Sequence, residues 1–242
     1  MKYEKIIKGQ FVSRPNRFVA DVKLNHSGEI TRAHVKNTGR CRELLLPGST
    51  VYLEDFTDRM GTRKMTYSLI GVEKVLPDGQ VLMINMDSQA PNKVTAEALA
   101  SGKIILPGMG RLTEIRGEKT YGDSRFDFYV EDEDGRRGFI EVKGVTLEDG
   151  GLVRFPDAPT ERGVKHLREL MKARAEGYMA YALFIVQMEG MRLFMPNDDT
   201  HPAFGDALRE AAEADVGVLA YQCRVTEDTL EVTCPLEVRL TT

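Results

Sequence analysis

Three side chains in the stretch Ser124 to Val145 have the types and spacing to act together, namely Asp127, Glu141 and Lys143. Apolar and polar residues alternate on both sides of a turn-forming segment, Asp132 to Arg137, which predicts two strands joined by a hairpin. Strand alternation puts Glu141 and Lys143 on one face, and hairpin pairing could bring Asp127 close to Glu141. We therefore expect two carboxylates and one ammonium at one end of a sheet.

Two neighbouring carboxylates repel each other, so this arrangement needs positive charge between them. Mg²⁺ (or Mn²⁺) fits, because it takes oxygen ligands and keeps several waters when only one or two carboxylates hold it. Lys143 could then orient or deprotonate a water that attacks a phosphodiester, and stabilise the charge that develops on phosphorus. This is the chemistry of a metal-dependent nuclease. The plainer alternative is a salt-bridged hairpin whose charges face water.

Composition narrows the class of protein. The 242 residues include no run of 18 apolar residues that could cross a membrane, and the N-terminal residues lack the pattern of an export signal. Cys41, Cys223 and Cys234 lack metal-ligand spacing and fit a reducing compartment, so we expect a cytoplasmic protein. Only four histidines are present, which argues against a His-rich metal site. The sequence does not reveal the oligomeric state, although a homodimer would suit an enzyme that cuts a duplex.

Charge is distributed unevenly along the chain. Residues 1 to 50 contain ten Lys and Arg against four acidic residues, a balance of +6. The total is −4, so the remainder carries −10. A basic front section that meets phosphates is one interpretation, with DNA, and possibly RNA, as the partner. The other interpretation is chance unevenness.

From Tyr3 to about Asn85, five or six short β runs alternate with turns, which predicts a small OB-like barrel in residues 1–86. Such barrels bind nucleic acid through basic side chains and stacking aromatics. The candidates lie in two groups, Arg14, Arg17 and Phe18, and Lys36, Asn37, Arg40 and Arg42. For the second group the alternative is a loop plus a short helix, Cys41 to Leu46, whose leucines pack on the barrel. Both interpretations can hold together.

Residues 87–242 alternate helical and strand patterns, which predicts a second, α/β domain. Asp87 to Asn92 is the expected linker, and Asn92 is the expected cap of a helix from Lys93 to Ser101. Glu97 projects from that helix. In nucleases of this architecture the first helix often adds a third carboxylate to the metal site, but Glu97 could equally be a solvated surface residue.

Thr146 to Pro159 is rich in Gly, Asp and Pro, and we expect it to form a loop beside the site. Thr160 can cap a helix from Glu161 to about Gly177. Arg162 and His166 are four residues apart and share one face of this helix. They could contact a phosphate or simply face solvent. A buried strand, a helix and a final strand pair follow, which completes an α/β (α+β) pattern.

The Asp, strand and Glu-x-Lys pattern resembles the PD-(D/E)xK nuclease superfamily, a restriction-endonuclease-like α/β fold. The Pro of that name is absent, because Arg125 and Phe126 precede Asp127, which still supplies the carboxylate. Four longer motifs occur in order, and with them the chain resembles the bacterial and archaeal sugar fermentation stimulation protein family. The motifs are KNTGR at 36–40, YGDSRFD at 121–127, EVKGVTL at 141–147 and FPDAPT with Arg162 and Gly163 at 155–163.

That resemblance implies an N-terminal OB-like domain, a C-terminal nuclease-like domain and DNA binding without strong sequence preference. It also implies a link to the regulation of maltose and other sugar use. Three hypotheses follow. The chain is a Mg²⁺-dependent nuclease for DNA or RNA, or a DNA-binding regulator that keeps the nuclease fold without turnover, or an interaction module with an incidental charged hairpin. The intact triad favours the first, and the third leaves the basic front section unexplained.

Overall fold

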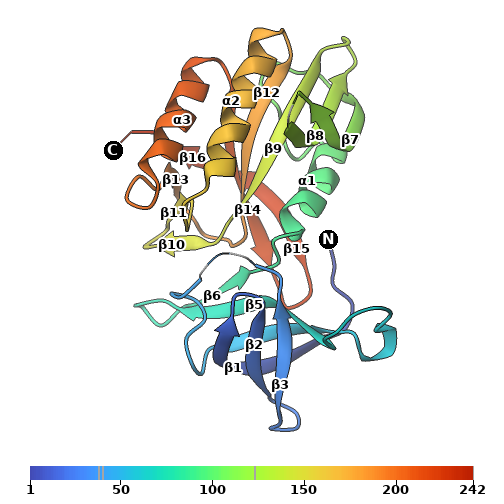
Figure 1. The fold of residues 1–242 in the computed structure, drawn as a ribbon, viewed down its shortest axis with the longest axis vertical. Helices are drawn as coiled ribbons and strands as arrows, with labels where there is room; N and C mark the ends of the chain where they lie inside the picture. The colour runs from blue at the N-terminus through green and yellow to red at the C-terminus, as the bar shows by residue number, and fades with distance from the viewer. Residues whose placement is uncertain (38, 40, 123, 242) are drawn as a thin grey trace.

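The computed structural model describes residues 1–37, Gly39, 41–122 and 124–241. It has two stacked parts, as Figure 1 shows: a barrel of strands formed by the first 85 residues, and above it a sheet covered by helices. This arrangement confirms the expected mixed α/β fold. No helix in the described ranges is long and apolar enough to cross a membrane.

The first part is a closed barrel of five strands. Antiparallel pairing runs in the order β3-β2-β1-β4-β5, and parallel pairing between β3 and β5 closes the cylinder. A sixth strand, β6 (Val81–Asn85), pairs with β5, and a short 3₁₀ helix covers Thr57–Arg59. The closure confirms the predicted OB-like barrel. The five strands are β1 (Ile6–Asn16), β2 (Val19–Leu24), β3 (Ile30–Val35), β4 (Thr50–Asp55) and β5 (Tyr67–Val75).

Alternating apolar residues explain how the barrel buries its interior. On β2, Ala20, Val22 and Leu24 are buried and the polar residues between them point outward. The pairing of β1 with β2 is irregular after Phe11, and before that point β1 pairs with β4 along its other edge. The segment Cys41 to Leu46 is a turn rather than a short helix, and Leu44 and Leu45 are buried in the barrel core.

The second part is built on a six-stranded sheet in the order β15-β14-β12-β9-β8-β7. Strands β7, β8 and β9 form an antiparallel meander, β9, β12 and β14 run parallel, and β15 returns antiparallel. The central strand β12 is buried along nearly its whole length, as its continuous apolar run predicts. The strands are β7 (Leu112–Tyr121), β8 (Ser124–Asp132), β9 (Arg137–Val145), β12 (Met179–Val186), β14 (Gly217–Val225) and β15 (Leu230–Pro235).

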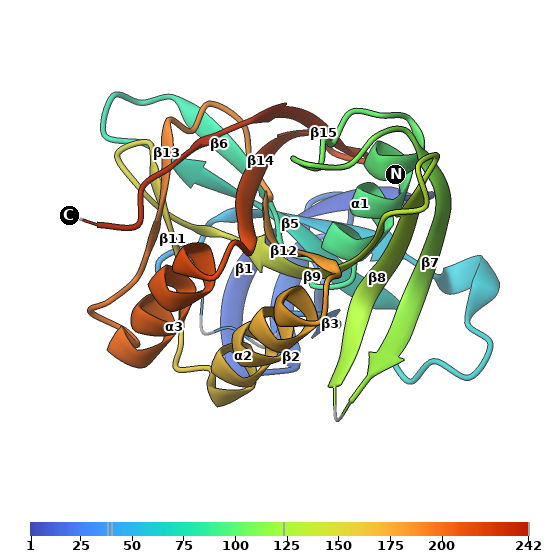
Figure 2. The same ribbon diagram turned by 90° about the horizontal axis from the view of Figure 1, so that it is seen from above.

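Helices cover both faces of this sheet. Figure 2 shows α1 (Ala90–Ala100) on one side, and α2 (Glu161–Ala175) and α3 (Pro202–Glu213) together on the other. The core divides in the same way, because Val94 and Leu99 of α1 pack in one apolar cluster while Leu167 and Phe204 of the other helices pack in a second. Helices therefore pack against this sheet from both faces.

The predicted loop Thr146 to Pro159 is not entirely loop. It contains β10 (Leu147–Asp149) and β11 (Leu152–Phe155), which pair antiparallel. With β13 (Leu193–Pro196) and β16 (Glu237–Val238) they form a small second sheet in the order β10-β11-β13-β16. The loop expectation was wrong because β10 and β11 form a short hairpin whose outer partner, β13, comes from a distant part of the chain.

Buried polar contacts fix the barrel against the α/β part. The backbone N–H of Asn85 donates to Gln187 O at 2.9 Å, and the Gln187 amide donates to Asn85 Oδ1 at 2.9 Å and to Asp87 O at 3.1 Å. The Lys36 ammonium donates to Asp87 Oδ2 at 3.0 Å. A polar contact in a low-dielectric interior is costly to break, so these bonds hold one relative arrangement of the two parts.

Candidate active site

The site forms where strands β8 and β9 separate. Their pairing runs from Glu131 opposite Arg137 to Phe128 opposite Ile140, and Asp127 and Glu141 are the next residues of the two strands. There the N–H of Val142 donates to the Asp127 carboxylate at 2.8 Å. The two carboxylates therefore lie close together at the point where the regular backbone pairing of β8 with β9 ends and side-chain contacts begin.

Asp127 is held from the α1 side of the sheet. The Asn92 side-chain amide donates to Asp127 Oδ1 at 2.8 Å. Burial raises the pKa of Asp127, and the negative charge of Glu141 raises it further. Asn92 does not cap the helix as predicted, because α1 begins at Ala90, with Pro91 in its first turn. Asn92 instead lies in the first turn of α1, from which its side chain contacts Asp127.

Glu141 has the opposite electrostatic balance. Burial raises the pKa of Glu141, but hydrogen bonding to His166 and the ammonium of Lys143 outweigh burial, so the pKa lies below its usual value. Both groups contact the same carboxylate oxygen, Oε1, with Lys143 Nζ at 2.6 Å. The other oxygen, Oε2, is buried and has no hydrogen-bond partner. An unpartnered carboxylate oxygen in a buried site is costly unless a cation or water completes it.

His166 and Arg162 form a pair on α2. Thr160 caps this helix as predicted, with its hydroxyl accepting from Gly163 N at 3.1 Å. His166 is buried, its Nδ1 faces Glu141, and its Nε2 accepts from Arg162 Nε at 3.3 Å. Both ring nitrogens therefore bond within the protein, and a contact of His166 with nucleic acid stays a prediction that this geometry does not support. Arg162 is exposed at the edge of the same cluster.

Glu97 lies away from the two carboxylates. Its exposed side chain accepts from the amino group of Met1 at 2.6 Å. Asn92 faces Asp127, and five helical residues correspond to about 140° of rotation, so Glu97 projects in another direction. This position gives no support to the expectation of Glu97 as a third metal ligand.

Two basic residues of the barrel serve the protein interior. The Arg14 guanidinium donates to the backbone carbonyls of Arg17, Asn37 and Gly39 at 2.7 to 3.0 Å, and so holds the loop that follows β3. Lys36 pairs with the buried Asp87. In this structure their charges help to fix the loop in place, and a phosphate contact from either side chain stays a prediction.

Three other residues predicted to contact nucleic acid, Arg17, Phe18 and Arg42, are exposed. Phe18 is 43 % exposed, and the Arg17 guanidinium stacks on its ring at 4.6 Å from the centroid. Arg42 is also exposed. The side chain of Asn37 instead accepts from Gly39 N at 2.7 Å and shapes the loop. Arg40 lies outside the described residues.

Ion pairs neutralise part of the basic front section. Lys2, Lys5 and Lys8 each lie within 4 Å of an acidic side chain from outside the first 50 residues, and Arg32 pairs with Asp21, which the balance already counts. The +6 balance of the first 50 residues therefore overstates the positive charge that is available to a phosphate backbone. The exposed side chains of Arg17 and Arg42 are therefore better candidates for phosphate contacts than the net charge of this section indicates.

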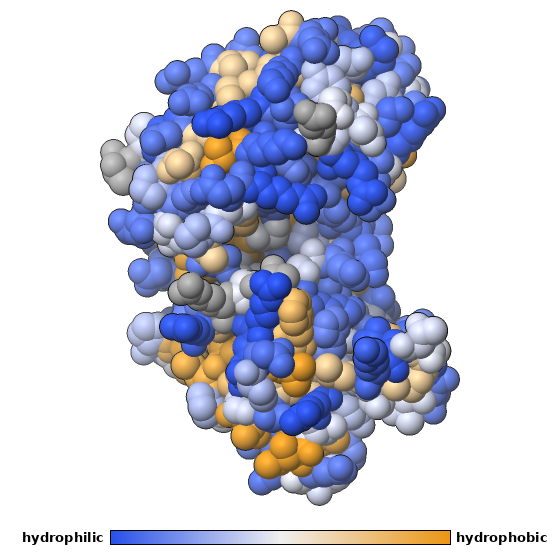
Figure 3. Space-filling model, viewed as in Figure 1, coloured by the Kyte–Doolittle hydropathy of each residue, from blue (hydrophilic) through white to orange (hydrophobic). Residues whose placement is uncertain are grey.

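A small polar pocket joins the barrel loop to the active end of the sheet. It has a volume of about 150 Å³, and its walls include Asn37 and Gly39 of the barrel and Gly144 and Arg154 of the α/β part. Gly144 directly follows Lys143 in β9, although the triad side chains themselves do not line the pocket. The surface narrows between the two parts at this level (Figure 3).

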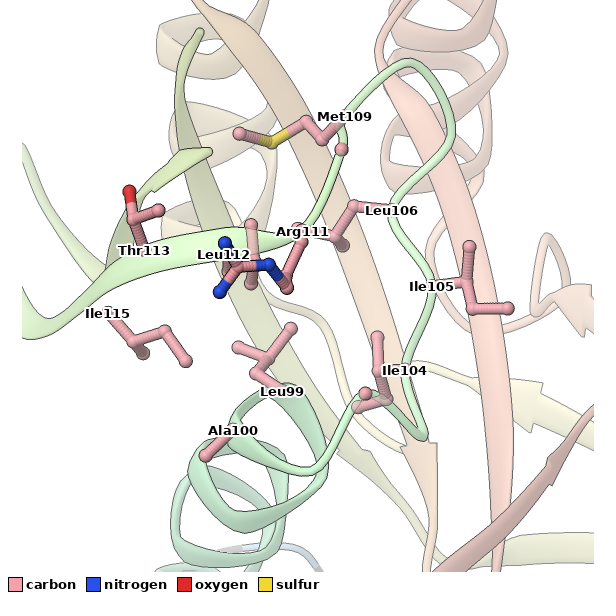
Figure 4. A pocket seen from close by; sticks show the side chains of 12 residues that line it. Leu99, Ala100, Ile104, Ile105, Leu106, Met109, Arg111, Leu112, Thr113 and Ile115 are labelled. Carbon is pink, nitrogen blue, oxygen red and sulfur yellow. The ribbon is translucent and has the colours of Figure 1, made fainter. Parts of the chain in front are cut away.

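A larger, apolar pocket has no part in this site. It measures about 580 Å³ and lies between the end of α1 and the start of β7, where Leu99, Leu106 and Leu112 converge (Figure 4). Among the described residues that line it, none is acidic and Arg111 is the charged one. It lacks the carboxylates that metal-dependent chemistry needs.

The residues present fit a divalent cation with few protein ligands. Within the described ranges, no group of three or more His, Cys, Asp or Glu side chains has the arrangement of a metal site. The free, buried Oε2 of Glu141 and the raised pKa of Asp127 nevertheless indicate a place where positive charge would stabilise both carboxylates. Two carboxylates plus waters is a ligand set that Mg²⁺ accepts.

Comparison with known proteins identifies the family. The model of the sugar fermentation stimulation protein RE domain matches residues 89–229, and that of the SfsA N-terminal OB domain matches residues 12–84. The chain belongs to the sugar fermentation stimulation protein family. Among family members, a homolog from Desulfitobacterium hafniense is 55% identical over 96% of this chain and 95% of its own. One from Clostridium beijerinckii is 50% identical over 96% of both chains.

A solved structure of the family has the same fold. The structure of Pyrococcus furiosus SfsA in complex with Ca²⁺ superimposes with a TM-score of 0.84 at 28% sequence identity, covering 99% of this chain and 98% of that one. The recognition made from the four sequence motifs is thus confirmed. Sequence reasoning missed Asn92 and the contact of His166 with Glu141, since neither residue is near its carboxylate partner in the chain.

Proposed function

We propose that this protein is a metal-dependent phosphodiester hydrolase that acts on DNA, or possibly RNA. The observation that carries the proposal is the buried Glu141 Oε2, which has no hydrogen-bond partner and lies in the same cluster as Asp127 and Lys143. The relative from Pyrococcus furiosus, solved with Ca²⁺, adds support for a divalent cation. Bound Mg²⁺ or Mn²⁺ would supply a Lewis acid for a phosphoryl oxygen and an activated water.

Each side chain then has a defined task. Asp127 and Glu141 would hold the cation through their carboxylate oxygens. The Lys143 ammonium would orient the attacking water and stabilise negative charge on the phosphoryl group, where a fixed positive charge is most effective. Arg17 with Phe18, and Arg42, would hold the nucleic-acid strand at the end of the barrel that faces the α/β part, the aromatic ring by stacking and the arginines through phosphates.

The experiment measures nucleotide release from labelled single- and double-stranded DNA and RNA, with Mg²⁺, Mn²⁺ or EDTA. Wild type should cut at least one substrate, and only with metal. Lys143→Ala should lower the rate by about 100-fold or more, since removing one stabilising group of this kind costs about that much. DNA affinity should hardly change. Lys103→Ala is the control, because Lys103 is an exposed lysine paired with Glu231 and its loss should leave the rate intact.

A DNA-binding regulator of sugar use without turnover is the second candidate. The contacts of Lys143 and His166 with Glu141 favour it, because the ammonium compensates the charge of that carboxylate and the ring hydrogen-bonds to it without a metal ion. If wild type and Lys143→Ala both bind DNA and neither cuts any substrate with any metal, this second function replaces the first.

We place either activity in the cytoplasm, since all three cysteines are free thiols. For a duplex substrate, we propose that the protein acts as a homodimer.

A further inference from the structure

The contacts of His166 define where its ring proton lies. Arg162 Nε always carries a hydrogen, so His166 Nε2, which it contacts at 3.3 Å, must be the acceptor. The proton is then on Nδ1, which donates to Oε1 of Glu141. The reverse tautomer would turn an N–H toward the guanidinium and a lone pair toward the carboxylate, and both contacts would become repulsive.

The surroundings of His166 keep this arrangement in place. Arg162 and His166 are four residues apart on one face of α2, which the Thr160 hydroxyl caps. The ring is 5 % exposed and meets the edge of Phe126, with 6.4 Å between ring centroids. Burial strengthens both polar contacts of the ring, because water does not compete for them.

We propose that His166 is a positioning residue for Glu141, and that Arg162 acts through His166 by fixing its tautomer. The inference rests on the proposed function, in which Glu141 is a metal ligand. His166 and Lys143 both bind Oε1, so the carboxylate cannot rotate freely and Oε2 is left as the atom that meets the cation. Partners of this kind orient a ligand and tune it without touching the metal.

The first test reads the tautomer directly by ¹⁵N NMR of the histidine rings in the full-length protein. The chain has four histidines, and the ring signals that vanish in His166→Asn belong to His166. We expect a protonated Nδ1 and an unprotonated Nε2 in wild type, and a mixture of tautomers in Arg162→Met. Arg168→Met, which removes an exposed arginine from the same helix, should leave the wild-type pattern. A protonated Nε2 in wild type would overturn the proposal.

The second test measures Ca²⁺ affinity by calorimetry, which needs no turnover. His166→Ala should bind Ca²⁺ about 10- to 100-fold more weakly, the usual effect of losing such a partner. His166→Asn carries a side-chain N–H near the position of Nδ1 and should recover most of the affinity, whereas His166→Gln, with its N–H near Nε2, should not. Equal affinity in the three variants would refute the positioning role.

These readouts separate the two proposals. If wild type binds no Ca²⁺ and cuts nothing, the metal-dependent function fails, and the His166 role that depends on it fails too. If wild type binds and cuts but the variants keep full affinity, only the His166 role fails. The tautomer measurement then shows whether Arg162 fixes the ring independently of any metal.

Discussion

Asp127 and Glu141 carry the same functional group but have pKa values shifted in opposite directions. Burial and the charge of Glu141 raise the pKa of Asp127, whereas the contacts from His166 and Lys143 overcome burial and lower that of Glu141. Carboxylates that differ in this way often have different roles in catalysis. The difference comes from the partners: Glu141 has the Lys143 ammonium and His166 from α2, whereas Asp127 has the neutral amide of Asn92 from α1, whose hydrogen bond does not offset burial and the charge of Glu141.

Arg17 and Arg42 are the exposed arginines that we propose as phosphate contacts. We expect Arg17→Ala and Arg42→Ala each to weaken DNA binding and to reduce the slope of log affinity against log salt by about one, as for the loss of one phosphate contact. Filter binding at several salt concentrations measures both quantities. Arg116→Ala, on β7 beside Glu114, is the control. Charge reversal at Arg17 and Arg42 together with unchanged affinity would show that the binding face lies elsewhere.

At the scale of elements, the hairpin between β8 and β9 is fixed by one carboxylate. Asp132 accepts from the backbone N–H groups of Gly110, Asp134 and Arg136 at 2.8 to 3.0 Å. The bond from Gly110, followed by those from the hairpin turn, lowers the pKa of Asp132 against the effect of burial. This turn sets the register of the β8–β9 pairing, whose last pair, Phe128 opposite Ile140, directly adjoins Asp127 and Glu141.

A pH prediction follows for Asp132→Asn. A carboxylate with a lowered folded-state pKa adds stability above its unfolded pKa of about 3.9, and that stability is lost as pH falls through the folded-state pKa. The variant should therefore melt a few degrees below wild type near neutral pH, and the difference should shrink toward about pH 3. Melting followed by circular dichroism across this range measures it. The exposed Asp134 accepts no backbone N–H in the described structure, so Asp134→Asn should show a smaller effect at every pH.

Gly144, near the end of β9, lies where α1 packs closely against the sheet. A Cβ at Gly144 would lie 2.5 Å from Gln187 Oε1 and 2.8 Å from Pro91 Cγ, so one of them must move. Gly144→Ala should cost about 1–3 kcal/mol of unfolding free energy in urea titrations, the usual effect of overpacking. Gly117→Ala adds the same methyl group on β7, where its closest contact is Asp127 O at 4.0 Å. Equal losses in the two variants would contradict close packing at Gly144.

At the scale of the whole molecule, the barrel and the α/β part share buried polar contacts. Asp87 is almost fully buried between them and pairs with Lys36, with further bonds from the Tyr3 hydroxyl and Gln89 N. The barrel loop is therefore fixed relative to α1, which carries Asn92. The position of the nucleic-acid face relative to the two carboxylates depends on this junction.

Lys36→Ala tests whether Lys36 is structural. Removing one partner of a buried ion pair costs roughly 3–5 kcal/mol, and we expect the lower end of that range because Asp87 keeps its other hydrogen bonds. Urea unfolding measures the loss, and Lys23→Ala, an exposed lysine on β2, should have little effect. The salt dependence of DNA binding by folded Lys36→Ala should match wild type. A reduced slope with unchanged stability would instead return Lys36 to the phosphate-binding face.

Local patterns in the sequence predicted much of this protein. Alternation placed Glu141 and Lys143 on one strand face, turn composition located the hairpin, and Thr160 was identified as a cap. The four motifs gave the family and with it the OB-like barrel. These features depend on residues close together in the chain, where strand and helix geometry determines which side chains share a face.

Tertiary structure alone decided what surrounds the carboxylates. Asn92 and His166 reach Asp127 and Glu141 across 35 and 25 residues of chain, and Arg14 and Lys36 turn inward to fix a loop and a domain junction. Glu97 points away, although it is on the helix that contributes Asn92. Such contacts depend on how a helix is rotated and seated on its sheet, and packing of the complete core sets that rotation.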